Sequence, residues 1–208
     1  MLKSFSRLNL LSKEYISPFK KGFSQLIRWD TSILRITLPY YDYLRGLVFI
    51  DDTKRVYEEE TPITFDLAAL ISLLHDDFIY HTQKGVRNHQ QTASFLLHMK
   101  ENYLSTKQTK TMKRVEGKGN TFAFEIEEEE ESVNKEKDVV IIELSMREAK
   151  IQRTEVLLYD ISPYFQGEWI TVEELITILY LDFIHKVKRE GNNEKVMKSV
   201  LKGLEFYK

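Results

Sequence analysis

The chain of 208 residues has no cysteine, and it has only four prolines and eight glycines. The absence of cysteine excludes disulfides, zinc sites with thiolate ligands and cysteine nucleophiles. It fits a reducing compartment, so we expect a cytoplasmic protein. No apolar run reaches the roughly 20 residues that a membrane-spanning helix requires. Because the net charge is only −2, the bulk composition does not favour nucleic acid or an anionic membrane as a partner.

Sequence fingerprints of common enzyme classes are also missing. The chain has no Gly-rich dinucleotide-binding loop, no nucleophile elbow and no HExxH metal-binding pair. Gly117-Lys118-Gly119 does not make a phosphate-binding loop, because the GxxxxGK[ST] frame is not there. We therefore expect no cofactor and no bound metal.

Apolar residues are abundant: 42% of the chain is hydrophobic and 12% is aromatic, which is typical of a folded globular protein. Residues 1–30 form a basic segment that is predicted to be helical, with Leu2, Phe5, Leu8 and Leu11 on one face. An acid-poor amphipathic N-terminus of this kind resembles a mitochondrial presequence. The mitochondrial matrix is therefore the alternative location.

The following sequence predicts an α+β fold. Residues 32–38 are apolar and β-branched, and the short apolar run 47–50 follows a tyrosine-rich stretch. Two such runs predict a β-hairpin, with residues 23–29 as a candidate third strand. Helical periodicity then covers residues 64–84 and 88–104. We interpret residues 31–105 as one α+β unit, a hairpin of two or three strands followed by a helical hairpin.

The same order of elements recurs in residues 139–208: predicted strands at 139–144 and 156–160 are followed by helices that start near Thr171 and near Asn193. A shift of 105 positions aligns residues 70–99 with residues 175–204 and gives nine identities. A shift of 108 positions aligns the two predicted β-hairpins. We predict a tandem duplication, with residues 139–208 as the second unit. The rival explanation is chance similarity between amphipathic helices, which share Leu and Ile at a period of 3.6 residues.

Residues 106–138 connect the two units. The stretch from Lys107 to Arg114 is basic, residues 121–126 alternate like a half-exposed strand, and Glu127–Glu131 is an unbroken acidic run. Such a run is usually a solvated loop. We predict a charged connection with a strand or hairpin and an acidic loop.

The most chemically suggestive stretch holds two histidines and two aspartates. On a helix, Asp77 and His81 lie one turn apart on a flank of the apolar face, whereas Asp76 points to solvent and His75 lies on the other flank. An Asp–His pair at this spacing can bind a metal, but two ligands do not make a site. A third ligand could come from a histidine of the next predicted helix.

The second unit serves as a control for this stretch. Asp77 corresponds to Asp182, and His81 corresponds to Lys186. Both units therefore keep an acid followed one turn later by a basic side chain, which is typical of a helix-surface pair. A pairing of Asp77 with Asp182 across the two halves is a further hypothesis.

A second candidate site is the tyrosine-rich stretch of the first hairpin. Tyr40, Tyr41 and Tyr43 lie between Arg35 and Arg45. Exposed aromatic and guanidinium groups stack on bases or hold peptides. The alternative that we favour is that these tyrosines pack over the end of the sheet.

Three functional hypotheses follow, in this order. The first is a non-enzymatic interaction protein (a regulator, an assembly factor or a structural subunit) whose partner is another protein. The second is a nucleic-acid-binding protein that uses the basic N-terminus, the basic stretch from Lys107 to Arg114 and the tyrosine-rich stretch. The third is a metal-dependent hydrolase centred on Asp77 and His81.

Overall fold

The structure, a computed structural model, describes residues 31–104, 107–115, 123–131 and 138–205. The fold is α+β, as predicted: within these residues, six α-helices accompany two separate antiparallel sheets of two strands each. The predicted N-terminal helix and the candidate third strand fall in residues 1–30, outside the described part. None of the described helices is both long enough and apolar enough to cross a bilayer.

The central sheet joins the two predicted units. Strand β1 (Thr31–Pro39) pairs antiparallel with β4 (Val139–Arg147), and Arg35 lies opposite Glu143 at the centre of the register. Buried and exposed residues alternate along β1, so one face of the sheet is turned towards the helices. The outer face carries the Arg35–Glu143 ion pair, with a nitrogen–oxygen distance of 2.6 Å.

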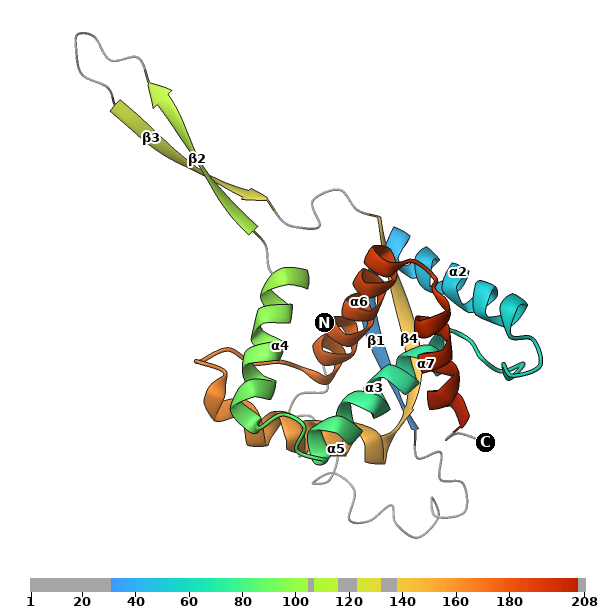
Figure 1. Cartoon of the computed structure of the whole chain (residues 1–208). Coiled ribbons are helices and arrows are strands. Elements are labelled where there is room, and N and C mark those ends of the chain that lie inside the picture. Colours follow the sequence, from blue (N-terminus) through green and yellow to red (C-terminus); the bar gives the residue numbers. More distant parts are fainter. Residues whose placement is uncertain (1–30, 105–106, 116–122, 132–137, 206–208) are drawn as a thin grey trace.

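Each strand of this sheet is followed by helices in the same order. After β1 come α2 (Tyr40–Val56), α3 (Leu67–Gln83) and α4 (His89–Tyr103). After β4 come α5 (Glu148–Ile161), the short 3-10 helix η2 (Ser162–Tyr164), α6 (Val172–Glu190) and α7 (Glu194–Glu205). The order strand, helix, helix, helix thus occurs twice, as Figure 1 shows.

The predicted β-hairpins are wrong, because the second strand of each is helical. Residues 47–50 lie inside α2, and residues 156–160 lie inside α5. A run of four apolar residues fits a strand or a helix equally well, and only the wider pattern separates them. In α2 the buried positions recur at helical spacing: Asp42, Gly46, Phe49, Ile50 and Thr53.

The predicted helix starts agree with the structure, with one change. Asn88 with Gln91 and Thr171 with Glu174 form capping boxes at α4 and α6. The cap of α3 is Asp66, whose carboxylate accepts a hydrogen bond from the Ala69 backbone at 2.8 Å. Short side chains of this kind satisfy the free N–H groups of a first turn, which is why the sequence signals them well.

The connection between the units contains a hairpin, as predicted, but the acidic run is not a loop. Strands β2 (Lys107–Val115) and β3 (Ala123–Glu131) pair antiparallel, and in Figure 1 the hairpin projects from the helical body. Opposite charges on facing strands favour such a ladder, since cross-strand pairs are the unit of sheet stability. The register pairs Lys107 with Glu131, Lys110 with Glu128 and Lys113 with Glu125.

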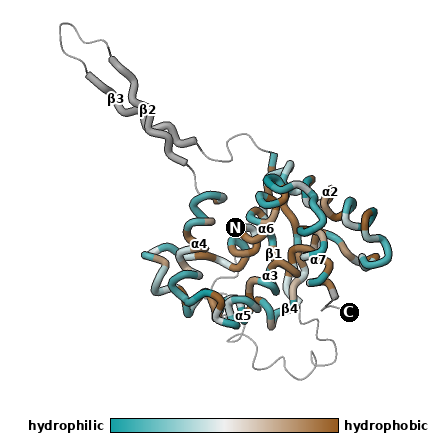
Figure 2. The backbone as a smooth tube through the Cα atoms, viewed as in Figure 1, coloured by the Kyte–Doolittle hydropathy of each residue, from teal (hydrophilic) through white to brown (hydrophobic). Residues whose placement is uncertain are grey.

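The core lies between the central sheet and helices α3 and α6, which pack on its inner face. Helix α6 packs on β1, and α3 packs on β4. Helix α4 in turn packs on α6, while α7 packs on α3. Figure 2 shows hydrophobic residues (brown) along α3 and α6. Among the largest fully buried side chains are Tyr180, Phe49, Phe65, Phe165, Leu34 and Ile36.

Candidate functional site

A cleft of about 410 Å³ lies among α3, α6 and α7, with one residue of α4 at its edge. Its size falls in the range of protein pockets that bind small molecules or side chains of a partner. The surfaces of the cleft combine apolar and charged groups. The apolar members are Leu73, Leu74, Phe78, Val86, Phe95, Leu179, Phe183, Val196 and Val200, and the charged members are Asp77, Arg87, Asp182 and Lys186, with His81 beside them.

The cleft brings together the four repeat positions that the sequence singled out. Asp77 and His81 come from α3, while Asp182 and Lys186 come from α6. The apolar surface follows the same correspondence, because the shift of 105 positions also relates Leu74 to Leu179, Phe78 to Phe183 and Phe95 to Val200.

Asp77 and His81 are in contact at an exposed place on α3, and this contact is an ion pair only when the imidazole is protonated. The Asp77 Oδ1 and His81 Nδ1 atoms are 3.2 Å apart, and the two side chains are 68% and 53% exposed. The same Nδ1 atom lies 2.8 Å from the Asp77 carbonyl oxygen, so Nδ1 carries a hydrogen and donates it. In the neutral ring, Nε2 is then the acceptor. Because both groups are solvated, the pair contributes at most about 1 kcal/mol.

Asp182 is held by the end of α4. The Tyr103 hydroxyl donates to Asp182 Oδ1 at 3.4 Å, and it also lies 3.2 Å from the Nδ1 atom of His185. Burial, together with the charge of Asp182, raises the pKa of Tyr103 to about 12. The hydroxyl therefore keeps its proton at physiological pH, and Asp182 has a permanent hydrogen-bond donor.

The two cations of the cleft, Arg87 and Lys186, make fewer polar contacts than its two aspartates. The Arg87 guanidinium lies 4.3 Å from the centre of the Phe95 ring, a cation–π contact. Lys186 is exposed on α6. The nearest acid further along that helix is Glu190, whose pKa is lowered first by its hydrogen bond from Arg189 at 2.8 Å and also by the charge of Lys186. Within the described residues, neither Arg87 nor Lys186 has an ion-pair partner within 4 Å.

The described residues contain no group of three or more histidine, aspartate or glutamate side chains placed to hold a metal ion. Among the residues that line the cleft, Asp182 is the only other one besides Asp77 and His81 with a carboxylate or imidazole side chain. The arrangement gives no observation that favours the hydrolase hypothesis.

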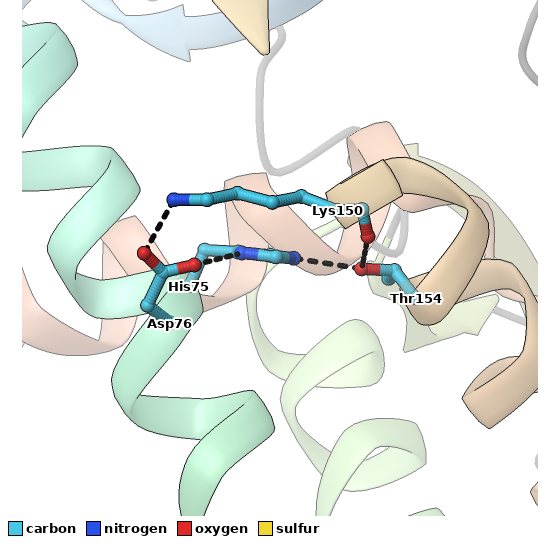
Figure 3. A network of polar contacts seen from close by, with 4 residues as sticks. All are labelled: His75, Asp76, Lys150 and Thr154. Carbon is cyan, nitrogen blue, oxygen red and sulfur yellow. Dashed lines mark hydrogen bonds and ion pairs between the residues drawn. The ribbon is translucent and has the colours of Figure 1, made fainter. Parts of the chain in front are cut away.

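Sequence reasoning missed a buried polar network on the other side of α3, drawn in Figure 3. His75 is only 1% exposed, and its Nε2 atom lies 2.7 Å from the Thr154 hydroxyl. Its Nδ1 atom lies 3.2 Å from Asp76, whose second oxygen accepts from Lys150 at 2.5 Å. Asp76 therefore does not simply point to solvent: it ties α3 to α5.

The corresponding contact in the other half is different in chemistry. His75 corresponds to Tyr180, which is fully buried and donates from its hydroxyl to the Asp42 carbonyl at 2.9 Å. That hydroxyl sits directly over Gly46 of α2. In the sequence, the signal that could have indicated a buried polar contact was the large polar side chain at this position of both predicted units, His75 and Tyr180.

The tyrosine-rich stretch does not form a single surface. All three tyrosines lie in the first turns of α2; Tyr40 and Tyr41 are exposed with their rings 5.6 Å apart, and Tyr43 packs on the core. Arg35 pairs with Glu143 on the outer sheet face, while Arg45 lies 3.8 Å from Asp42. The five side chains therefore do not face in one direction and do not form one surface that a ligand could contact.

Comparison of the chain with protein-family models, curated proteins and solved structures gave no match.

Proposed function

We propose that this protein is a non-enzymatic interaction protein, built from two related halves, that holds a segment of another protein in the cleft between α3, α6 and α7. The observation that carries the proposal is the composition of the cleft. Much of its apolar and charged lining comes from positions of the two halves that the shift of 105 aligns, such as Asp77 with Asp182 and Phe78 with Phe183. A concave surface with aromatic walls and charged rims is typical of sites that hold side chains of a partner.

The relationship of the halves is supported by the central sheet. Arg35 and Glu143 face each other at its centre, and they are also the two residues that the shift of 108 positions aligns. The strands are therefore related by a local twofold axis normal to the sheet. The packing of the helices fits the same axis, because α6 of the second half packs on β1 of the first half and α3 of the first half packs on β4 of the second. An ancestral dimer fused into one chain accounts for this arrangement.

The state of the ionisable groups in the cleft favours binding over catalysis. Catalytic acids and bases are usually desolvated, since burial is what adjusts their pKa values to the reaction. Asp77 and His81 are instead more than half exposed. Asp182 accepts a hydrogen bond from Tyr103, whose hydroxyl keeps its proton because its pKa is raised to about 12.

The nucleic-acid hypothesis gains no support from the fold. The basic stretch of the connection lies in β2, and its register partner β3 contains six glutamates. A groove for a phosphate backbone requires unbalanced positive charge. The tyrosine-rich stretch, another element of that hypothesis, is spread around α2. The third element, the basic N-terminus, lies outside the described residues.

A photo-crosslinking experiment tests the proposal. A photoreactive phenylalanine analogue is placed at Val86, which lines the cleft and is 65% exposed, and in a second variant at Ile63, which lies outside the cleft and is 97% exposed. In the native source, we expect a defined protein adduct from position 86 and none from position 63. Equal adducts from both positions, or none from position 86, would reject the cleft as the binding site.

A further inference from the structure

We propose that the partner segment held by the cleft is an acidic amphipathic helix, which inserts apolar side chains between Phe78 and Phe183 and places carboxylates on Arg87 and Lys186. This proposal rests on the interaction function proposed above and specifies the chemistry of the partner.

The charge of the ligand follows from which charges in the cleft are already paired. Both aspartates already have contacts within the chain, although with groups that carry no fixed charge: the Asp77 carboxylate lies 3.2 Å from His81 Nδ1, and Asp182 accepts from the Tyr103 hydroxyl. The cations Arg87 and Lys186 have no ion-pair partner within the described residues, as shown above. A ligand with carboxylates gains two new pairs at this surface, whereas a basic ligand must compete for acids that are already engaged.

The apolar part of the ligand follows from the surface between the charges. Phe183 is 9% exposed and packs edge-on against Phe49 with a ring distance of 5.1 Å, so it is a rigid part of the floor. Val196 and Val200 of α7 are each 5% exposed beside it. Fixed apolar groups of this kind accept Leu or Phe side chains with little loss of entropy on the protein side.

The helical form of the ligand follows from the elements around the cleft. Its surface is built by helices α3, α6 and α7, whose side chains form ridges and grooves into which a further helix packs. Helices α3 and α6 run in opposite directions in Figure 1. Arg87 follows the end of α3 and Lys186 lies near the end of α6, so the cations approach the cleft from opposite ends. A helix with carboxylates near both of its ends presents one carboxylate to each of these cations.

Fluorescence anisotropy with designed peptides tests the proposal. The probe is a labelled peptide of about 18 residues, long enough to be partly helical, with Leu at positions i, i+3, i+4 and i+7 and Glu on both flanks. The first control peptide has Lys in place of every Glu, and the second has Ser in place of every Leu. With the full-length protein at low salt, we expect the acidic peptide to bind at least about tenfold more tightly than either control.

Protein variants locate the binding. We expect Lys186→Glu to weaken the acidic peptide about fivefold to tenfold and to narrow its advantage over the basic peptide, since reversing one rim charge replaces an attraction by a repulsion. The matched control is Arg153→Glu, which makes the same change on the exposed face of α5, outside the cleft. The control variant should bind as the wild type does.

The outcomes separate this proposal from the interaction function itself. If the basic peptide binds as tightly as the acidic one and Phe183→Leu weakens both, the cleft binds peptides but does not select acidic ones, and only the present proposal fails. The same holds if a synthetic peptide of residues 1–30 binds more tightly than the acidic probe, because the cleft then belongs to the chain's own basic segment. If no peptide binds and position 86 gives no adduct, both proposals are refuted.

Discussion

The contact of Gly46 with Tyr180 allows a sharp test of how the halves fit together. Replacing a glycine in a helix interior by alanine normally stabilises a protein by about 1 kcal/mol. At Gly46 the new methyl group would overlap with the Tyr180 hydroxyl and come within 3.1 Å of Leu67 Cδ1. We therefore expect Gly46→Ala to destabilise the protein.

The magnitude follows from two costs. Overpacking a filled core costs about 1–3 kcal/mol. Displacing the Tyr180 hydroxyl also breaks its 2.9 Å hydrogen bond to the Asp42 carbonyl in a fully buried place, which costs about 1–3 kcal/mol more. After the gain in helix propensity, the net loss is about 3 kcal/mol. For a chain of this size it corresponds to a fall in Tm of about 6–12 °C.

A double-mutant cycle isolates the contact. Tyr180→Phe removes the overlapping oxygen and leaves the ring carbon Cζ 3.2 Å from the new methyl group. In urea unfolding, we expect Gly46→Ala and Tyr180→Phe together to cost about 1–3 kcal/mol less than the sum of the single changes. Gly203→Ala is the comparison, because the three atoms nearest to its new methyl group all belong to the apolar side chain of Leu73 and no hydrogen bond is at stake there. A stabilised Gly46→Ala variant, or a coupling near zero, would refute the packing described here.

Three further predictions concern stability. Burial and the charge of Glu173 raise the pKa of Glu155 to about 7 from 4.5. The protein should therefore lose stability as the pH rises from about 4.5 through 7. Glu155→Gln should remove this loss, measured as Tm at pH 5 and pH 8. Thr154→Val should cost about 1–3 kcal/mol in urea unfolding by leaving His75 Nε2 without its partner, and more than Thr53→Val, whose hydroxyl serves only its own helix. Gly191→Ala should cost about 1–2 kcal/mol, since Gly191 ends α6 at a φ of 72°. An unchanged pH profile, equal threonine costs or a neutral glycine change would contradict the respective structural reason.

Local signals in the sequence predicted the helices α3, α4, α6 and α7 well. The extents expected for α3 and α4 and the starts of α6 and α7 agree with the structure, because capping residues and apolar periodicity act over a few positions. The strand β1 was predicted as well. The helix α2 was not, since its short apolar run Leu47–Ile50 also fits a strand.

Long-range pairing could not be predicted from local pattern. The partner of β1 is β4, and no local signal distinguishes this pairing from a hairpin with a nearby strand. The acidic run Glu127–Glu131 was expected in a loop because its charge repels itself, and only a basic partner strand makes it a ladder.

The candidate site was predicted in part. The comparison of the halves singled out Asp77 and Asp182, and both line the cleft. Arg87 and Phe95 were missed, because they come from a connection and from the next helix, and their approach depends on how α4 packs on α6. The five residues around the tyrosine-rich stretch were placed together by sequence proximity, which a helix spreads in different directions.

The pairing of β1 with β4 also has a consequence for how the chain is made. When the ribosome has synthesised β1 and helices α2 to α4, the strand that completes the sheet does not yet exist, and at about 5–20 residues per second it follows several seconds later. During this interval the apolar face of β1 and the helix surfaces that later meet α6 lack their partner. We expect the nascent chain to depend on chaperones at this stage, and folding in vitro to be slow for a helix-rich protein, because its first strand must wait for contacts far along the sequence.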